Sequence, residues 1–115
     1  HYKQELSQFE GVNFPQDIDG HHSNRWLTTI TIDPLKTGGI TRENIRLALE
    51  EENIESRPFW KPMHLQPVFS NESSFVNGVS ESLFNDGLCL PSGTNMTEED
   101  KERIIQRIKL EFHKG

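Results

Sequence analysis

Three of the six prolines in this 115-residue chain lie within twelve consecutive residues, 58–69, with the sequence PFWKPMHLQPVF. Each proline lacks a backbone N–H donor and restricts the residue before it to extended conformations, which excludes a regular helix or a central strand here. We therefore predict a stiff loop that carries aromatic side chains. The regular elements of the fold must then lie on either side of it.

The chain begins with a short helical pattern. Tyr2, Leu6 and Phe9 follow the i, i+4, i+7 spacing of one helix face, which predicts the end of a helix whose earlier turns would precede this chain. Residues 11–24 consist mainly of Gly, Pro, Asp, Asn and His, which favour turns. We interpret this segment as a loop or linker.

Three segments have the length and composition of β-strands. Residues 25–33 alternate between two faces and are rich in β-branched side chains, which makes them the clearest strand. Residues 54–57 predict a second strand that stops at Pro58. Residues 88–90, with the sequence LCL, predict a short buried third strand.

Three further helices are predicted after residue 40. Thr41 caps the first, which runs to about Asn53, and Gly87 closes a short one that begins near Val79. The clearest begins at Thr97, which precedes three acidic residues and so nearly completes a capping box. The order of elements predicts an α+β fold, with a small antiparallel or mixed sheet of about three strands and helices packed on one face.

Charge and composition exclude several classes of partner. Twelve Lys and Arg against eighteen Asp and Glu give a net charge of −6, so nucleic acid and anionic membranes would be repelled on average. No apolar run approaches the roughly 18–20 residues that span a bilayer. The single cysteine excludes an internal disulfide and fits a reducing, cytoplasmic compartment. With 32% hydrophobic residues the chain can form only a small hydrophobic core, and we expect it to pack against the surface of a partner.

The polar residues outside the proline-rich loop do not assemble a catalytic or metal site. His21 and His22 lie near Asp17 and Asp19, but adjacent histidines point in different directions and no third ligand has a useful spacing. Cys89, between two leucines, is interpreted as a small buried hydrophobe rather than a nucleophile. We expect no bound metal and no catalytic residue in this chain.

The segment 57–67, RPFWKPMHLQP, is the best candidate for a binding surface. Its rings, two cations, imidazole and amide suit a polar, ring-shaped or anionic ligand. Because the prolines already stiffen the backbone, little ordering entropy is lost on binding. A structural loop that packs its aromatic side chains on the core and exposes Lys61 and His64 explains the composition equally well.

Five pieces of the sequence follow one another in a specific order and spacing. They are Arg25-Trp26-Leu27, Gly39-Ile40 with the helix after it, RPFWKPMHLQPVF at 57–69, GLCLPSG at 87–93 and MTEEDKERI at 96–104. Together they resemble the C-terminal part of DegT/DnrJ-type nucleotide-sugar aminotransferases, and the resemblance covers about residues 1–112.

The resemblance implies a pyridoxal phosphate enzyme of fold type I, in which a large upstream domain carries the cofactor and its Schiff-base lysine. Residues 1–24 would be the end of an interdomain helix and a linker, and residues 25–115 the small C-terminal domain. The large domain would be absent from this chain. The parent protein would be a cytoplasmic homodimer that transfers an amino group, from glutamate, to a keto-sugar nucleotide. The isolated chain is expected to be inactive.

The resemblance also gives the segment 57–67 a role, because it would reach an active site at the dimer interface and contact the sugar nucleotide. The expected substrate contacts are His64 first, then Trp60, Lys61 and Gln66, with Arg57 and Arg25 as candidates for pairing with phosphates or carboxylates. Lys61 is not expected to be the Schiff-base lysine, which needs a buried position under the cofactor ring. The alternative is a free-standing, non-catalytic binding module that holds a protein or sugar ligand with the same loop.

Overall fold

Four short strands pair into one antiparallel sheet, in the order β1-β2-β4-β3, in a computed structural model that describes residues 1–114. Their bounds are Val12–Asn13 (β1), Thr28–Ile32 (β2), Arg57–Pro58 (β3) and Gly87–Leu90 (β4). The central strands β2 and β4 form the longest pairing, in which Ile30 lies opposite Leu88 and Thr29 opposite Cys89. The predicted α+β class is thereby confirmed.

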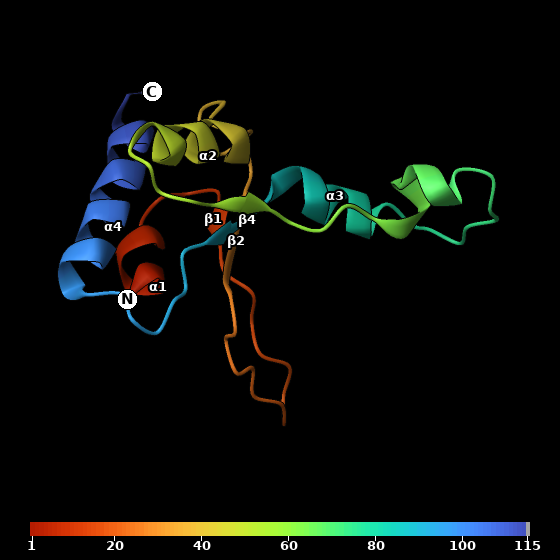
Figure 1. The fold of residues 1–115 in the computed structure, drawn as a ribbon, viewed down its shortest axis with the longest axis horizontal. Helices are drawn as coiled ribbons and strands as arrows, with labels where there is room; N and C mark the ends of the chain where they lie inside the picture. Colours follow the sequence, from red (N-terminus) through yellow and green to blue (C-terminus); the bar gives the residue numbers. More distant parts are fainter. Residues whose placement is uncertain (115) are drawn as a thin grey trace.

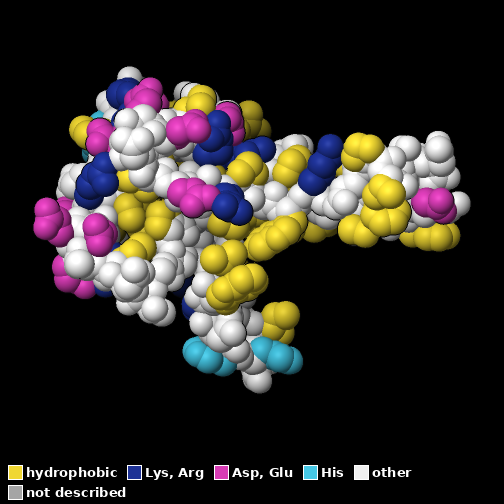
Figure 2. All heavy atoms as spheres, in the orientation of Figure 1, with side chains coloured by type: hydrophobic (Ala, Val, Ile, Leu, Met, Phe, Trp, Pro, Cys, Tyr) yellow, Lys and Arg dark blue, Asp and Glu magenta, His cyan; other side chains and the backbone are white. Residues whose placement is uncertain are grey.

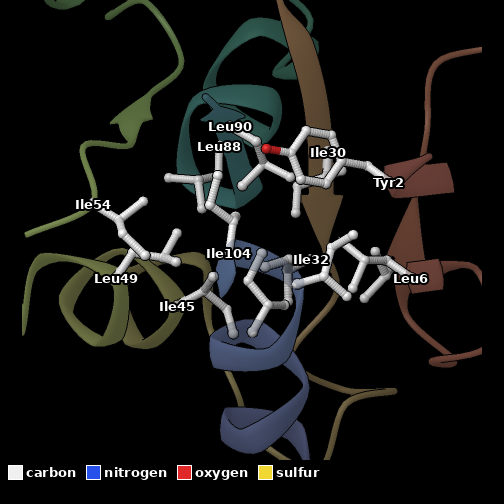
Figure 3. Close-up of a cluster of buried hydrophobic side chains, with 13 residues drawn as sticks. Tyr2, Leu6, Ile30, Ile32, Ile45, Leu49, Ile54, Leu88, Leu90 and Ile104 are labelled. Atoms are coloured by element: carbon white, nitrogen blue, oxygen red, sulfur yellow. The ribbon is translucent and has the colours of Figure 1, made fainter. Parts of the chain in front are cut away.

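Three helices enclose the hydrophobic core against one face of this sheet: α1 (Tyr2–Leu6), α2 (Arg42–Glu51) and α4 (Glu98–His113) (Figure 1). Ile30 and Leu88 are fully buried, and they meet Leu49 of α2 and Ile104 of α4 in a single cluster (Figure 3). The two isoleucines of β2 therefore face the core, as its alternating pattern predicts. No polar or charged residue is buried in residues 1–114.

Both predicted helix starts are confirmed by complete capping boxes. The Thr41 hydroxyl accepts a hydrogen bond from the Asn44 N–H, and the Asn44 side chain accepts one from the Thr41 N–H. Thr97 and Asp100 exchange the same two bonds at the start of α4. These bonds to Thr97 hold the pKa of the Asp100 carboxyl below its usual value. Each box satisfies backbone donors that the first helical turn leaves open.

The sheet contains four strands where the sequence predicts about three. β1 lies inside the segment 11–24, for which the sequence predicts a loop, because two residues are too few to show an alternating pattern. β3 also departs from expectation: the sequence predicts a strand at residues 54–57 that stops at Pro58, but residues 54–56 are not in a strand and Pro58 is. Proline is tolerated there because β3 is an edge strand and one side of it needs no ladder donor.

Two segments project from the body of the molecule, namely the connection between β1 and β2 and the connection between β3 and β4 (Figure 1). The longer one, residues 59–86, is called the arm; it contains two 3₁₀ turns, Met63–Leu65 and Pro67–Phe69, and helix α3 (Val79–Asp86). The predicted short helix is confirmed, but it contributes no buried residue and so does not join the layer of helices over the core. The radius of gyration is 15.4 Å, against about 13 Å for a compact chain of this length.

Candidate functional site

The arm exposes an unusual amount of apolar side chain to solvent. Phe75 is 101% exposed and Val68 76% exposed, values typical of an unfolded chain rather than a packed loop. The other large exposed hydrophobic residues of the arm are Trp60, Met63, Leu65, Val76, Val79 and Leu83. Figure 2 shows hydrophobic side chains along the whole projecting arm. So many exposed large apolar side chains on one projection are unusual for a surface that faces only water.

His64 is half-buried, unlike the exposed Trp60 and Lys61 of the same arm. Its side chain is 16% exposed, and its Nε2 atom lies 2.6 Å from Oε1 of Glu81 on α3. The imidazole is therefore held by a carboxylate from the part of the arm that returns to the sheet, residues 71–86. It is packed neither on the hydrophobic core nor free in solvent.

Gln66 and Lys61, both predicted as substrate contacts, lie in different surroundings in the arm. The Gln66 side-chain amide donates a hydrogen bond to the Lys61 carbonyl at 3.1 Å, which fixes the turn between them. The Lys61 side chain is exposed. Gln66 thus stabilises the loop, whereas the charge of Lys61 faces solvent.

An open groove of about 820 Å³ lies at the foot of the arm, between the sheet edge and the first turns of α4. Trp26 and Trp60, 75% and 67% exposed, both contribute to its lining. Arg57 and Arg103 add guanidinium groups, and Cys89 adds a thiol. Burial raises the pKa of the Cys89 thiol, which disfavours the nucleophilic thiolate. The lining also includes the carboxylates of Glu55 and Asp100, so the groove suits a flat group and contains no activated nucleophile.

The two predicted arginines lie in separate places and already have carboxylate partners. Arg57 donates to Glu55 at 2.8 Å, and both side chains are exposed. Arg25 adopts a left-handed φ of 51° and donates to Asp17 at 2.8 Å, lining a second cavity of about 400 Å³. Neither cavity is lined by His64, Lys61 or Gln66. The structure thus brings Trp60 and Arg57 together in one groove and leaves the other four residues outside it.

Two residues of this region are missing from the sequence-based prediction. Trp26 belongs to the alternating pattern of 25–33, which predicts a strand residue, but β2 begins only at Thr28 and the indole is exposed. Glu81 gives no sequence signal, because its partner His64 is 17 residues away. A non-local pair of this kind is visible only once the arm has folded back on itself.

The described residues contain neither a cluster of metal-binding side chains nor a buried lysine. No group of three or more His, Cys, Asp or Glu side chains in residues 1–114 is arranged to hold a metal ion. A Schiff-base lysine needs burial under the cofactor ring, and no charged residue in that range is buried. In the same range, no helix has the length and apolar character needed to cross a membrane.

The comparisons with known proteins agree with one another. The DegT/DnrJ/EryC1/StrS aminotransferase family model matches residues 1–109. EpsN of Bacillus subtilis (strain 168), assigned as a pyridoxal phosphate-dependent aminotransferase, is 44% identical over 97% of this chain and 29% of its own length. GDP-perosamine synthase of Vibrio cholerae is 28% identical over 97% of this chain and 30% of its own length.

The fold is shared with solved aminotransferases. The crystal structure of the aminotransferase TlmJ from Streptoalloteichus hindustanus superimposes with a TM-score of 0.81 at 22% identity. That superposition covers 98% of this chain and 29% of the TlmJ chain. The chain therefore spans less than a third of the length of these relatives.

Proposed function

Because the chain belongs to the DegT/DnrJ/EryC1/StrS aminotransferase family, we propose that it is the small C-terminal domain of a pyridoxal phosphate-dependent sugar aminotransferase. The parent transfers an amino group from glutamate to a keto-sugar nucleotide and works as a homodimer in the cytoplasm. In this assignment residues 1–24 are the end of an interdomain helix and a linker, and residues 25–115 are the domain itself. The observation that carries the proposal is a match across nearly the whole chain to under a third of each relative.

The cofactor belongs to the rest of the parent in this proposal. Pyridoxal phosphate, when bound, supplies the electron sink for amino transfer. Lys61, in the exposed arm, does not fit the buried position of a Schiff-base lysine. Residues 1–114 bury no charged group that would pair with the cofactor ring or its phosphate. The isolated chain is accordingly expected to be inactive.

The contribution of this chain is to close the active site and touch the substrate. The arm is a long projection with an apolar surface, and such a surface is stabilised when it rests on a large domain or on the second subunit of a dimer. His64 is the first expected contact with the sugar nucleotide, followed by Trp60 and Lys61. Gln66 acts by holding the loop that carries them, through its bond to the Lys61 carbonyl.

The two arginines are expected to change partners when substrate binds. Arg57 and Arg25 pair with exposed or half-exposed carboxylates, Glu55 and Asp17. Ion pairs of that kind contribute little in water. A nucleotide phosphate offers a bidentate acceptor of higher charge, so exchange of partners costs little.

The test compares this chain with the longer protein that its gene encodes, each incubated with pyridoxal phosphate. The longer protein should show the visible absorbance of a lysine Schiff base, and this chain should not. The longer protein should also convert glutamate to 2-oxoglutarate in the presence of nucleoside diphosphate keto-sugars, offered as a panel that varies the nucleobase. A Schiff base in this chain that borohydride traps would refute the division of roles.

Two substitutions locate the substrate surface in the longer protein. Trp60→Ala should raise the KM for the sugar nucleotide, because the indole supplies contact area at the foot of the arm. Leu110→Ala is the matched control, since Leu110 is 56% exposed on α4 and outside the groove. Equal changes in the KM for the sugar nucleotide in the two variants would refute the proposal that the arm contacts the substrate. A gene product without a lysine-bearing domain would favour the free-standing binding module instead.

A further inference from the structure

One side-chain hydrogen bond joins the two legs of the arm. The outward leg, residues 59–70, carries His64 in its first 3₁₀ turn, and the return leg, residues 71–86, carries Glu81 in α3. Nε2 of His64 lies 2.6 Å from Oε1 of Glu81. No other side-chain hydrogen bond connects the two legs within residues 1–114.

The start of α3 fixes where Glu81 lies on the arm. Glu81 lies in the first turn of the helix, where unpaired N–H groups favour a negative charge. The turn that leads into the helix is fixed by Gly78 at φ 84° and by Asn77, whose Oδ1 accepts a hydrogen bond from the Val79 N–H. A carboxylate held in this way can orient a ring that it binds.

An imidazole has two ring nitrogens, and the partner of one decides what the other can do. With Nε2 bound to Glu81, Nδ1 is the only ring nitrogen of His64 without a hydrogen bond to the described residues. The side-chain amide of the nearby Gln66 donates its hydrogen bond to the Lys61 carbonyl and not to Nδ1 of His64. At 16% exposure, the His64 side chain has little room to rotate without breaking the bond to Glu81.

We propose that Glu81 is a positioning residue for His64: it binds Nε2 and thereby presents Nδ1 to the sugar nucleotide. This inference rests on the proposed function in one respect, namely that His64 touches the substrate. Glu81 itself does not contact substrate and acts only through the imidazole. Its effect on binding therefore depends on His64 being present.

The first test needs no substrate. In the 115-residue chain with isotope-labelled histidines, the Nε2 proton of His64 should give an NMR signal that is shifted downfield and protected from exchange with water. Glu81→Ala should abolish that signal, whereas Glu81→Gln should keep it, because the amide oxygen accepts the same bond. Glu72→Ala is the matched control in the same arm. A protected signal that persists in Glu81→Ala would overturn the proposal.

His22 provides an internal reference in the same spectrum. Its Nδ1 lies 3.8 Å from Asp17, beyond hydrogen-bond reach, and its side chain is 91% exposed. It should show no protected ring proton in any variant. A protected signal from His22 equal to that of His64 would mean that the readout does not report the Glu81 bond, and the proposal would lose its support.

The second test uses the longer protein in the amino-transfer assay. Glu81→Ala should raise the KM for the sugar nucleotide about tenfold, the size expected when a mispositioned His64 loses its own hydrogen bond to the substrate, and leave the KM for glutamate unchanged. In a His64→Ala background the same substitution should add nothing. Glu99→Ala, an exposed acid of α4, is the control. An unchanged KM, or a full additional loss in the His64→Ala background, would refute Glu81 as a positioning residue.

The two tests separate this inference from the function on which it rests. A longer protein that aminates no sugar nucleotide refutes the proposed function, while the spectra of this chain still decide whether Glu81 orients His64. Conversely, an active enzyme with no protected His64 signal refutes the inference and leaves the function standing.

Discussion

Replacing Gly87 by alanine tests how the arm is joined to the sheet. Gly87 is the first residue of β4 and is buried. A Cβ atom there would lie 2.4 Å from the Leu83 carbonyl oxygen and 2.4 Å from the Phe59 ring. The φ of −91° is ordinary for alanine, so the effect is steric rather than conformational.

The size of the expected loss in stability follows from which atoms must move to make room for the methyl group. Both neighbours must retreat by about 1 Å to reach ordinary van der Waals separation. The Phe59 ring can rotate, but the Leu83 carbonyl is backbone, and its movement displaces the last turn of α3. Overpacking costs about 1–3 kcal/mol, and a rigid neighbour places this site near 3 kcal/mol. With a slope of about 2 kcal/mol per molar urea, the unfolding midpoint should fall by roughly 1.5 M.

Urea unfolding followed by far-ultraviolet circular dichroism, which reports the loss of helix, measures the change. Gly93→Ala is the matched control, because its Cβ would meet the side-chain oxygen of Asn95 at 2.9 Å, which can rotate away; its effect should stay below about 0.5 kcal/mol. Adding Phe59→Leu to Gly87→Ala should remove the clash with the ring and recover part of the lost stability. The recovery should be incomplete, because the clash with the Leu83 carbonyl remains. Gly87→Ala with wild-type stability would refute the steric account of the junction.

Three further predictions concern the body of the domain. Burial raises the pKa of Tyr2, the single tyrosine, to about 12, so ultraviolet titration should show its phenolate forming only near that pH. Because the unfolded chain loses this proton at a lower pH than the folded chain does, the free energy of unfolding should decline between about pH 10 and 12. Tyr2→Phe, which also loses the hydrogen bond to the Pro91 carbonyl, should remove this decline. A Tyr2 titration midpoint near the ordinary value would contradict the prediction. Thr97→Ala breaks the capping box with Asp100 and should cost about 1 kcal/mol in urea unfolding, and no cost would mean that the box is not formed in solution. The buried Cys89 thiol, with its raised pKa, should react with an aromatic disulfide reagent far more slowly than in the urea-unfolded chain, and equal rates would place it on the surface.

The sequence by itself determined the local elements and the family. Thr41 and Thr97 mark helix starts because a capping box is complete within four residues. The alternation of β-branched residues fixes β2, and three prolines keep 58–69 free of regular helix. These features depend on neighbours along the chain, so no tertiary contact is needed to read them.

Contacts between distant residues were decided only by the tertiary structure. The two residues of β1 become a strand because they pair with Ile32 and Thr31, and Pro58 is accepted because β3 lies at the sheet edge. The candidate site is of the same kind: Trp26 and Trp60 line one groove although 34 positions separate them along the sequence. The His64–Glu81 bond requires the arm to reverse direction. Local patterns cannot specify such pairs, because they exist only after loop closure brings separate segments together.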